Sequence, residues 1–136
     1  MTKVPKYWNK AKRHISKKDK IMGKLIKIYQ SPNETILTSR RDIFFSLCKS
    51  IIGQQISVAA ANSVFLKFKK KCNNKINAKK VSKLSFAQLK SCGLSRQKVL
   101  GIKSLAERVI EKSFNPKLIE KMTDEEAIEY LSNLRQ

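Results

Sequence analysis

The stretch that organises this sequence is residues 51–60, which read IIGQQISVAA. Apolar residues at helical spacing precede it, and Gly53 predicts a helix end with a left-handed glycine cap. Ser57 has the side chain expected at the N-cap of the next helix. Gln54 and Gln55 therefore lie at a predicted helix–helix junction. Their amides can donate and accept hydrogen bonds to bases, although a glycine cap followed by two exposed polar residues explains the same pattern.

A second junction of this kind is CGLSRQK at residues 92–98. Gly93 predicts a turn, and Ser95 predicts the N-cap of a further helix. The free backbone N–H groups at a helix start can hold a phosphate, and Arg96 and Lys98 lie beside them. An ordinary helix–turn–helix connection is the alternative interpretation.

Helical periodicity extends outward from both junctions. It predicts long helices over residues 41–52, 57–70, 95–110 and 123–134, the last opened by a capping box of Thr123 and Glu126. With only 4 glycines and 3 prolines, the chain has little material for the tight turns of a β-protein. We therefore expect an all-α bundle of about six to eight helices. The residues expected to face its core are Phe44, Leu47, Cys48, Ile51, Ile52, Val58, Ala61, Phe65, Phe68, Ile102, Leu105, Ala106, Val109, Ile110, Ala127, Ile128, Leu131 and Leu134.

The charge of the chain is strongly positive and unevenly spread. The 136 residues include 30 basic and 10 acidic side chains, a net charge of +20. Residues 1–106 hold 25 of the basic and only 3 of the acidic side chains, whereas residues 107–136 hold 5 and 7. This asymmetry is typical of a polyanion-binding protein. Compositional bias toward lysine, which supplies 24 of the 30 basic residues, is the competing explanation.

Several classes of site have no support in the sequence. His14 is the only histidine, and Cys48, Cys72 and Cys92 have no metal-ligand spacing, so we expect no metal. No glycine-rich phosphate loop is present, and we expect no cofactor. The carboxylates of residues 120–129 are explained by helix capping and a solvated face. No apolar run is long enough for a membrane span, and unpaired cysteines favour the reducing cytoplasm, here at the nucleoid.

Taken together, these segments resemble one branch of the helix-hairpin-helix DNA glycosylase superfamily, the DNA-3-methyladenine glycosylase II family. The matching pieces follow the family order over nearly the whole chain. They are Trp8, Ala11, Asp19, Leu25, Ile26, Tyr29, Phe44, Phe45, IIGQQISVAAA at 51–61, CGLSRQK at 92–98 and TDEEAI at 123–128.

This resemblance implies base excision repair of double-stranded DNA. Such enzymes flip an alkylated base, such as 3-methyladenine, out of the helix and hydrolyse its N-glycosidic bond. By the family pattern, Gln55 fills the gap left by the flipped base as a wedge, on a turn shaped by its two predecessors. The candidate DNA-contacting residues are therefore Gln55, Gly53, Gln54, Ser57, Ser95, Arg96 and Lys98.

The sequence also departs from the family pattern. In the family, the segment matching residues 123–134 is followed by a DNA-binding hairpin and then by the catalytic aspartate, and neither has a match before Gln136. The resemblance thus implies residues 1–39 as N-terminal helices and linker. It implies residues 40–136 as part of a glycosylase domain, ending before the hairpin. We expect this portion to be inactive alone, with the catalytic Asp beyond Gln136.

Two non-enzymatic alternatives remain open on the sequence. The first is a basic helical module that binds nucleic acid through its charge without recognising lesions. The second is a helical scaffold that binds a protein partner through its last helix, with the lysine excess purely compositional. The oligomeric state has no signature in the sequence.

Overall fold

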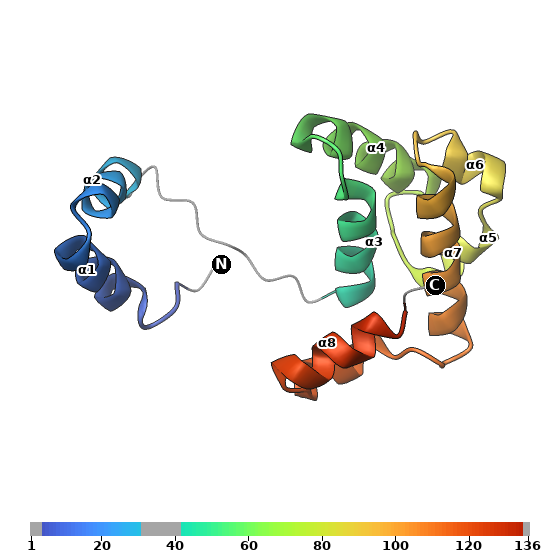
Figure 1. Cartoon of the computed structure of the whole chain (residues 1–136). Helices are drawn as coiled ribbons and strands as arrows, with labels where there is room; N and C mark the ends of the chain where they lie inside the picture. The colour runs from blue at the N-terminus through green and yellow to red at the C-terminus, as the bar shows by residue number, and fades with distance from the viewer. Residues whose placement is uncertain (1–3, 31–41, 135–136) are drawn as a thin grey trace. The chain divides into compact units, whose positions relative to one another are not determined.

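The computed structural model describes residues 4–30 and 42–134. Within these ranges the chain forms eight α-helices and one 3-10 helix, and no strand is present there. The predicted all-α class is therefore confirmed. The chain divides into two compact units, Met1–Arg40 and Arg41–Gln136 (Figure 1).

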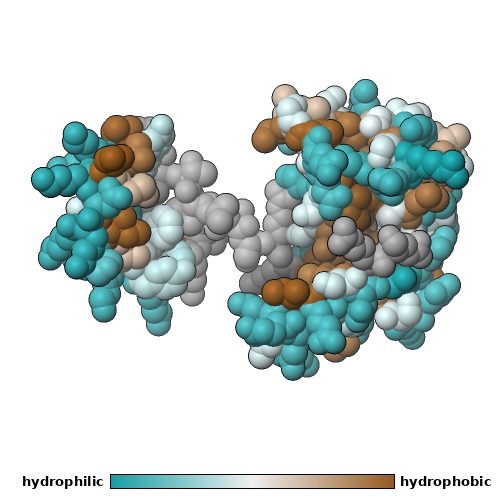
Figure 2. All heavy atoms as spheres, viewed as in Figure 1, coloured by the Kyte–Doolittle hydropathy of each residue, from teal (hydrophilic) through white to brown (hydrophobic). Residues whose placement is uncertain are grey.

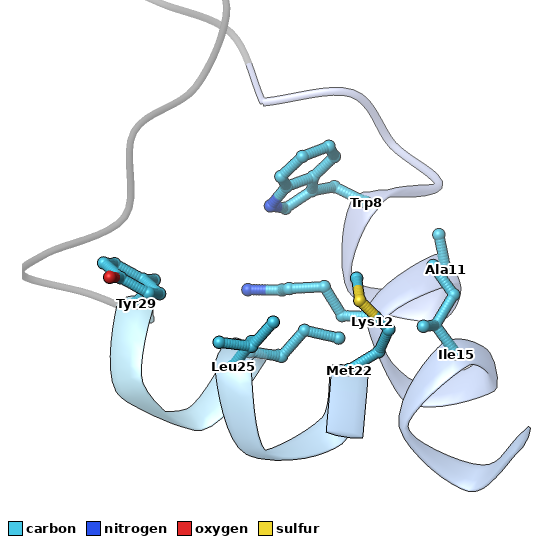
Figure 3. A pocket seen from close by; sticks show the side chains of 8 residues that line it. Trp8, Ala11, Lys12, Ile15, Met22, Leu25 and Tyr29 are labelled. Atoms are coloured by element: carbon cyan, nitrogen blue, oxygen red, sulfur yellow. The ribbon is translucent and has the colours of Figure 1, made fainter. Parts of the chain in front are cut away.

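The first unit is a helical hairpin of α1 (Trp8–Lys18) and α2 (Lys20–Tyr29). Asp19 joins the two helices, and its carboxylate accepts the backbone N–H groups of Ile21 at 2.8 Å and Met22 at 3.0 Å. No described residue of either helix is buried. Apolar side chains gather along the middle of the hairpin (Figure 2), and they line a groove between the helices (Figure 3). A two-helix hairpin is too small to enclose a core of its own.

The second unit holds the remaining helices, whose bounds are α3 (Ile43–Gly53), α4 (Val58–Lys71), α5 (Ala78–Lys83), α6 (Phe86–Lys90), α7 (Arg96–Ile110), the 3-10 helix η1 (Pro116–Lys121) and α8 (Asp124–Ser132). Helix α7 packs against α3, α5 and α6, and the second predicted junction leads directly into it (Figure 1). The largest fully buried side chains of this unit are Phe68, Phe114, Ile52, Leu89, Ile102, Val81, Val99, Cys48, Cys72 and Cys92.

Local capping rules account for where these helices begin. The hydroxyl of Ser57 accepts the N–H of Ala60 at 3.2 Å, and the hydroxyl of Ser95 accepts that of Lys98 at 3.3 Å. Thr123 and Glu126 form the predicted capping box at the start of α8. Each cap satisfies backbone donors that a helix start leaves without partners inside the helix.

Three of the expected core residues are exposed instead. Val58 is 78% exposed and Ile110 is 48% exposed, because they occupy the first position of α4 and the last position of α7. Ile128 is 65% exposed because α8 turns Tyr130 toward the core, where its ring stacks on Phe114 at a centroid distance of 5.1 Å. Of the eighteen expected residues, seven are buried and eight are half-buried. The other nine buried residues of the core, including Val81 on α5 and Leu89 on α6, were not predicted.

Candidate nucleic-acid interface

The first junction differs in backbone geometry from the sequence prediction. Helix α3 ends at Gly53, but Gly53 does not adopt the left-handed conformation. Gln54 follows in an extended conformation, with φ −60° and ψ 129°, and Gln55 has a φ of 57°. The predicted glycine cap is therefore wrong: the chain reverses at Gln55, two residues later, so that a glutamine occupies the position expected for a glycine.

Gln55 is one of four described residues other than glycine that have a positive φ; the others are Asn73, Asn74 and Lys112. A left-handed backbone costs an L-residue with a side chain about 1–2 kcal/mol, and glycine would avoid most of that cost. Gln55 is exposed, as are the residues from Gln54 to Ala60 around it. Its side chain therefore gains little from packing within the chain. Strain of this kind, held in place by surrounding structure, is commonly found at functional sites.

The second junction has the geometry that its sequence predicts. Gly93 has a φ of 96°, and a Cβ atom added there would lie 3.2 Å from Cγ2 of Val64. Both the backbone conformation and the contact with α4 therefore require glycine at this position. Leu94 is buried. Ser95 caps α7, and the exposed Arg96 is the first residue of that helix.

A single lysine connects the two junctions. The ammonium of Lys98 donates to the backbone carbonyl of Ile52 at 2.9 Å and to that of Gln54 at 2.8 Å. Residues separated by more than forty positions in the sequence are thereby brought together at the C-terminus of α3. The structure therefore brings Lys98, from the second junction, against the first junction, whereas the contact of the seven candidate residues with DNA remains a prediction.

The cysteines are structural members of the core. All three are free and buried. Burial raises the pKa of Cys48 to about 12 and the pKa of Cys72 to about 11. A thiol held in its protonated form is a poor nucleophile and a poor metal ligand, so these side chains serve as small apolar residues.

The described residues contain no group of three or more His, Cys, Asp or Glu side chains placed to hold a metal ion. The carboxylates near the C-terminus include Glu126, whose side chain accepts the backbone N–H of Thr123 at 2.8 Å in the capping box. His14 is exposed on α1. Among the described helices, none is long and apolar enough to cross a membrane.

Two features of the site were missed by reasoning from the sequence. The left-handed conformation of Gln55 has no local signal, because glutamine is not a residue that favours it. The bonds from Lys98 to the first junction depend on how α3 and α7 pack. The motif placed Lys98 beside the second junction, and only the fold shows that its ammonium reaches the first.

Comparison with known proteins identifies the class to which this fold and site belong. The profile of the HhH-GPD superfamily of base excision DNA repair proteins matches residues 48–134, a region that contains both junctions. The chain therefore belongs to the HhH-GPD superfamily.

Within that superfamily, the chain is similar to particular glycosylases. It is 27% identical over 129 residues to DNA-3-methyladenine glycosylase 1 of Schizosaccharomyces pombe, covering 93% of this chain and 57% of the relative. It is 28% identical over 132 residues to the alkylbase DNA glycosidase-like protein mag2 of the same yeast, covering 94% and 62%. The chain thus spans about three fifths of the length of these curated relatives.

Two solved structures share the fold of this chain. The S. pombe 3-methyladenine DNA glycosylase Mag1, solved in complex with abasic DNA, superposes with a TM-score of 0.79 at 27% identity, over 91% of this chain and 62% of that chain. DNA-3-methyladenine glycosidase from Bacillus halodurans superposes with a TM-score of 0.68 at 23% identity, over 89% of this chain and 55% of that chain. The second likeness shows the fold alone.

Proposed function

We propose that this chain is part of a base excision repair glycosylase of the DNA-3-methyladenine glycosylase II branch. Its substrate is double-stranded DNA that carries alkylated bases such as 3-methyladenine. In this proposal the chain supplies the surface that holds DNA open at the lesion, and we assign the hydrolytic aspartate to no residue of this chain. The free, buried thiols suit a reducing compartment, so we place the protein in the cytoplasm, at the nucleoid.

The observation that carries the proposal is the exposed, left-handed Gln55 at the turn between α3 and α4. An amide on a short turn can enter the gap that a flipped base leaves and can hydrogen-bond to the unpaired base opposite. The strain at Gln55 has no counterpart in packing within the chain, which is expected if the residue is placed for a ligand. The relative solved on abasic DNA supports DNA as that ligand.

The chemistry required of such an enzyme is limited. Flipping a damaged base costs a few kcal/mol, less than flipping a normal one, because the damaged base pairs and stacks less well. Alkylation that leaves the base cationic already makes it a good leaving group. The enzyme then has to stabilise positive charge on the sugar and position a water molecule. A residue that keeps the gap open favours the flipped state and so acts before the bond breaks.

The central test compares binding of the 136-residue chain to a duplex with one abasic site and to the intact duplex, at about 50 and 200 mM salt. We expect a preference for the abasic duplex at both salt concentrations. Gln55→Ala should weaken binding to the abasic duplex by about tenfold and leave binding to the intact duplex nearly unchanged. Gln97→Ala, which removes an exposed amide from the start of α7, is the matched control and should preserve the preference.

If Gln55→Ala lost equal affinity for the abasic and the intact duplex, Gln55 would not act as a wedge. The chain alone should release no 3-methyladenine from methylated DNA. Measurable release would contradict the view that no residue of this chain serves as the hydrolytic aspartate.

The net charge of +20 favours one other function, a basic module that binds nucleic acid without recognising lesions. That function predicts a steep fall of affinity with salt and equal affinity for abasic and intact duplexes. The same binding experiment therefore separates the two functions.

A further inference from the structure

The ammonium of Lys98 is bound at a point that controls the wedge turn. It donates at 2.8 Å to the carbonyl oxygen of Gln54, and that carbonyl belongs to the same planar peptide unit as the N–H of Gln55. Its second bond, at 2.9 Å to the carbonyl of Ile52, fixes the last turn of α3 just before the glycine. Lys98 thus clamps the backbone on the N-terminal side of Gln55 at two places.

The backbone on the other side of Gln55 is fixed independently. Ser57 caps α4, and its hydroxyl accepts the N–H of Ala60. Gln55 therefore lies between a clamped peptide and a capped helix start. With both flanks fixed, the left-handed conformation at position 55 lets the chain connect the end of α3 to the start of α4. Removing the clamp would free the peptide between Gln54 and Gln55 to rotate, and Gln55 could then relax to an ordinary conformation.

Electrostatics give the same lysine a second effect at this position. The C-terminus of α3 carries the partial negative charge of the helix dipole, which disfavours the approach of a phosphate backbone. The Lys98 ammonium lies directly on these carbonyls and offsets their charge. The turn that carries Gln55 can therefore approach DNA with less electrostatic cost.

We propose that Lys98 is a positioning residue that holds Gln55 in its left-handed, DNA-inserting conformation by clamping the carbonyls of Ile52 and Gln54. This inference rests on the proposed function, because it assigns Lys98 a role through the wedge. It differs from the reading in which Lys98 binds a phosphate directly, since its ammonium is directed at the protein backbone.

Helix α7 offers a matched control in Lys103. Its ammonium donates to the carbonyl of Leu84 at 2.8 Å, so it is also a half-buried lysine bound to a helix-end carbonyl. Leu84 lies at the end of α5, far along the chain from Gln55. Lys98→Met and Lys103→Met remove the same chemical group from the same helix. Only the first removes the clamp on the wedge turn.

The first measurement is NMR of the full chain without DNA. In Lys98→Met we expect the HN–Hα coupling and the amide shift of Gln55 to lose their left-handed values, whereas Lys103→Met keeps them. A Gln55 that keeps its left-handed backbone in folded Lys98→Met would overturn the inference, whatever the DNA experiments show.

The second measurement is the preference for abasic over intact duplex in a double-mutant cycle. Lys98→Met should reduce this preference by about as much as Gln55→Ala, roughly tenfold, and the double variant should lose nothing further. Independent, multiplying losses, or an equal loss of affinity on both duplexes that leaves the preference unchanged, would overturn the positioning role of Lys98. A wild-type chain with no preference would count against the proposed function instead, and the NMR measurement would still decide the role of Lys98.

Discussion

The two helix junctions of the larger unit look alike in sequence and are built differently. Each has a glycine followed within four residues by a serine that caps the next helix. Gly93 has a positive φ, and a Cβ atom added there would lie 3.2 Å from Val64, so the fold requires glycine at this position. Gly53 has neither feature, since a Cβ added there would meet nothing within 4 Å and the positive φ belongs to Gln55. The second junction thus serves packing, whereas the first keeps a strained polar residue exposed.

The largest expected effect on stability comes from Gly93→Ala. Forcing alanine into the left-handed conformation, with its Cβ against Val64, should lower the free energy of unfolding by about 1–2 kcal/mol. Urea unfolding followed by circular dichroism measures it. Gly101→Ala is the control: Gly101 lies inside α7 with open space around it, and it should gain about 0.5–1 kcal/mol. Losses of similar size from both variants would contradict the comparison.

A smaller effect of opposite sign is expected from Gln55→Gly. Glycine accepts the left-handed conformation without strain, so the free energy of unfolding should rise by about 0.5 kcal/mol even though a residue with a side chain is lost. Gln54 has an ordinary φ, so Gln54→Gly should lower the free energy of unfolding by about 0.5 kcal/mol. The same Gln55→Gly variant should lose the preference for abasic DNA. A variant that is both less stable and still selective would show that Gln55 is not strained for function.

The smallest effect at neutral pH concerns the thiols near each junction. Burial raises the pKa of Cys48, on α3, to about 12, so the folded chain retains a proton that the unfolded chain loses near pH 9. The stability from this group is complete below pH 9 and falls as the pH rises toward 12. At Cys92, beside Gly93, burial also raises the pKa, but Lys71 and Lys67 oppose the rise.

Unfolding free energies measured from pH 8 to 11 test this difference between the two thiols. Cys48→Ala should flatten the alkaline decline more than Cys92→Ala, because the two variants differ only in which thiol is removed. A steeper decline in Cys48→Ala than in the wild type would contradict the assigned sign.

Local rules predicted much of this fold because they act over a few residues. The caps at Ser57, Ser95 and Thr123 follow from side chains that bond to backbone groups three positions away. The fold class follows from periodicity and from the shortage of turn-forming residues. Exposure at Val58 and Ile128 was not predictable in this way, because the rotation of a helix end depends on what packs against it.

The same contrast between local and long-range interactions applies to the candidate site. Its residues were found from the two junction motifs and from the family resemblance. What joins them was not found, because Lys98 and the carbonyl of Gln54 are distant in the sequence and meet only when α7 packs on α3. The conformation of Gln55 is likewise a property of the assembled turn, which outweighs the intrinsic preference of glutamine.

The bond from Lys98 to a helix end has a consequence for how this composition supports a fold. Helix α3 ends with a carbonyl bound by Lys98, α4 with a carbonyl bound by Lys80, and α5 with a carbonyl bound by Lys103. Many proteins use glycine to finish helices, but this sequence has 4 glycines and 30 basic residues. In this protein lysine thus stabilises helix ends where other proteins often use glycine. Charge engineering of this protein should therefore leave these three lysines unchanged. Exchanging them for glutamate would remove hydrogen bonds that hold helix ends in place, as well as change the surface potential.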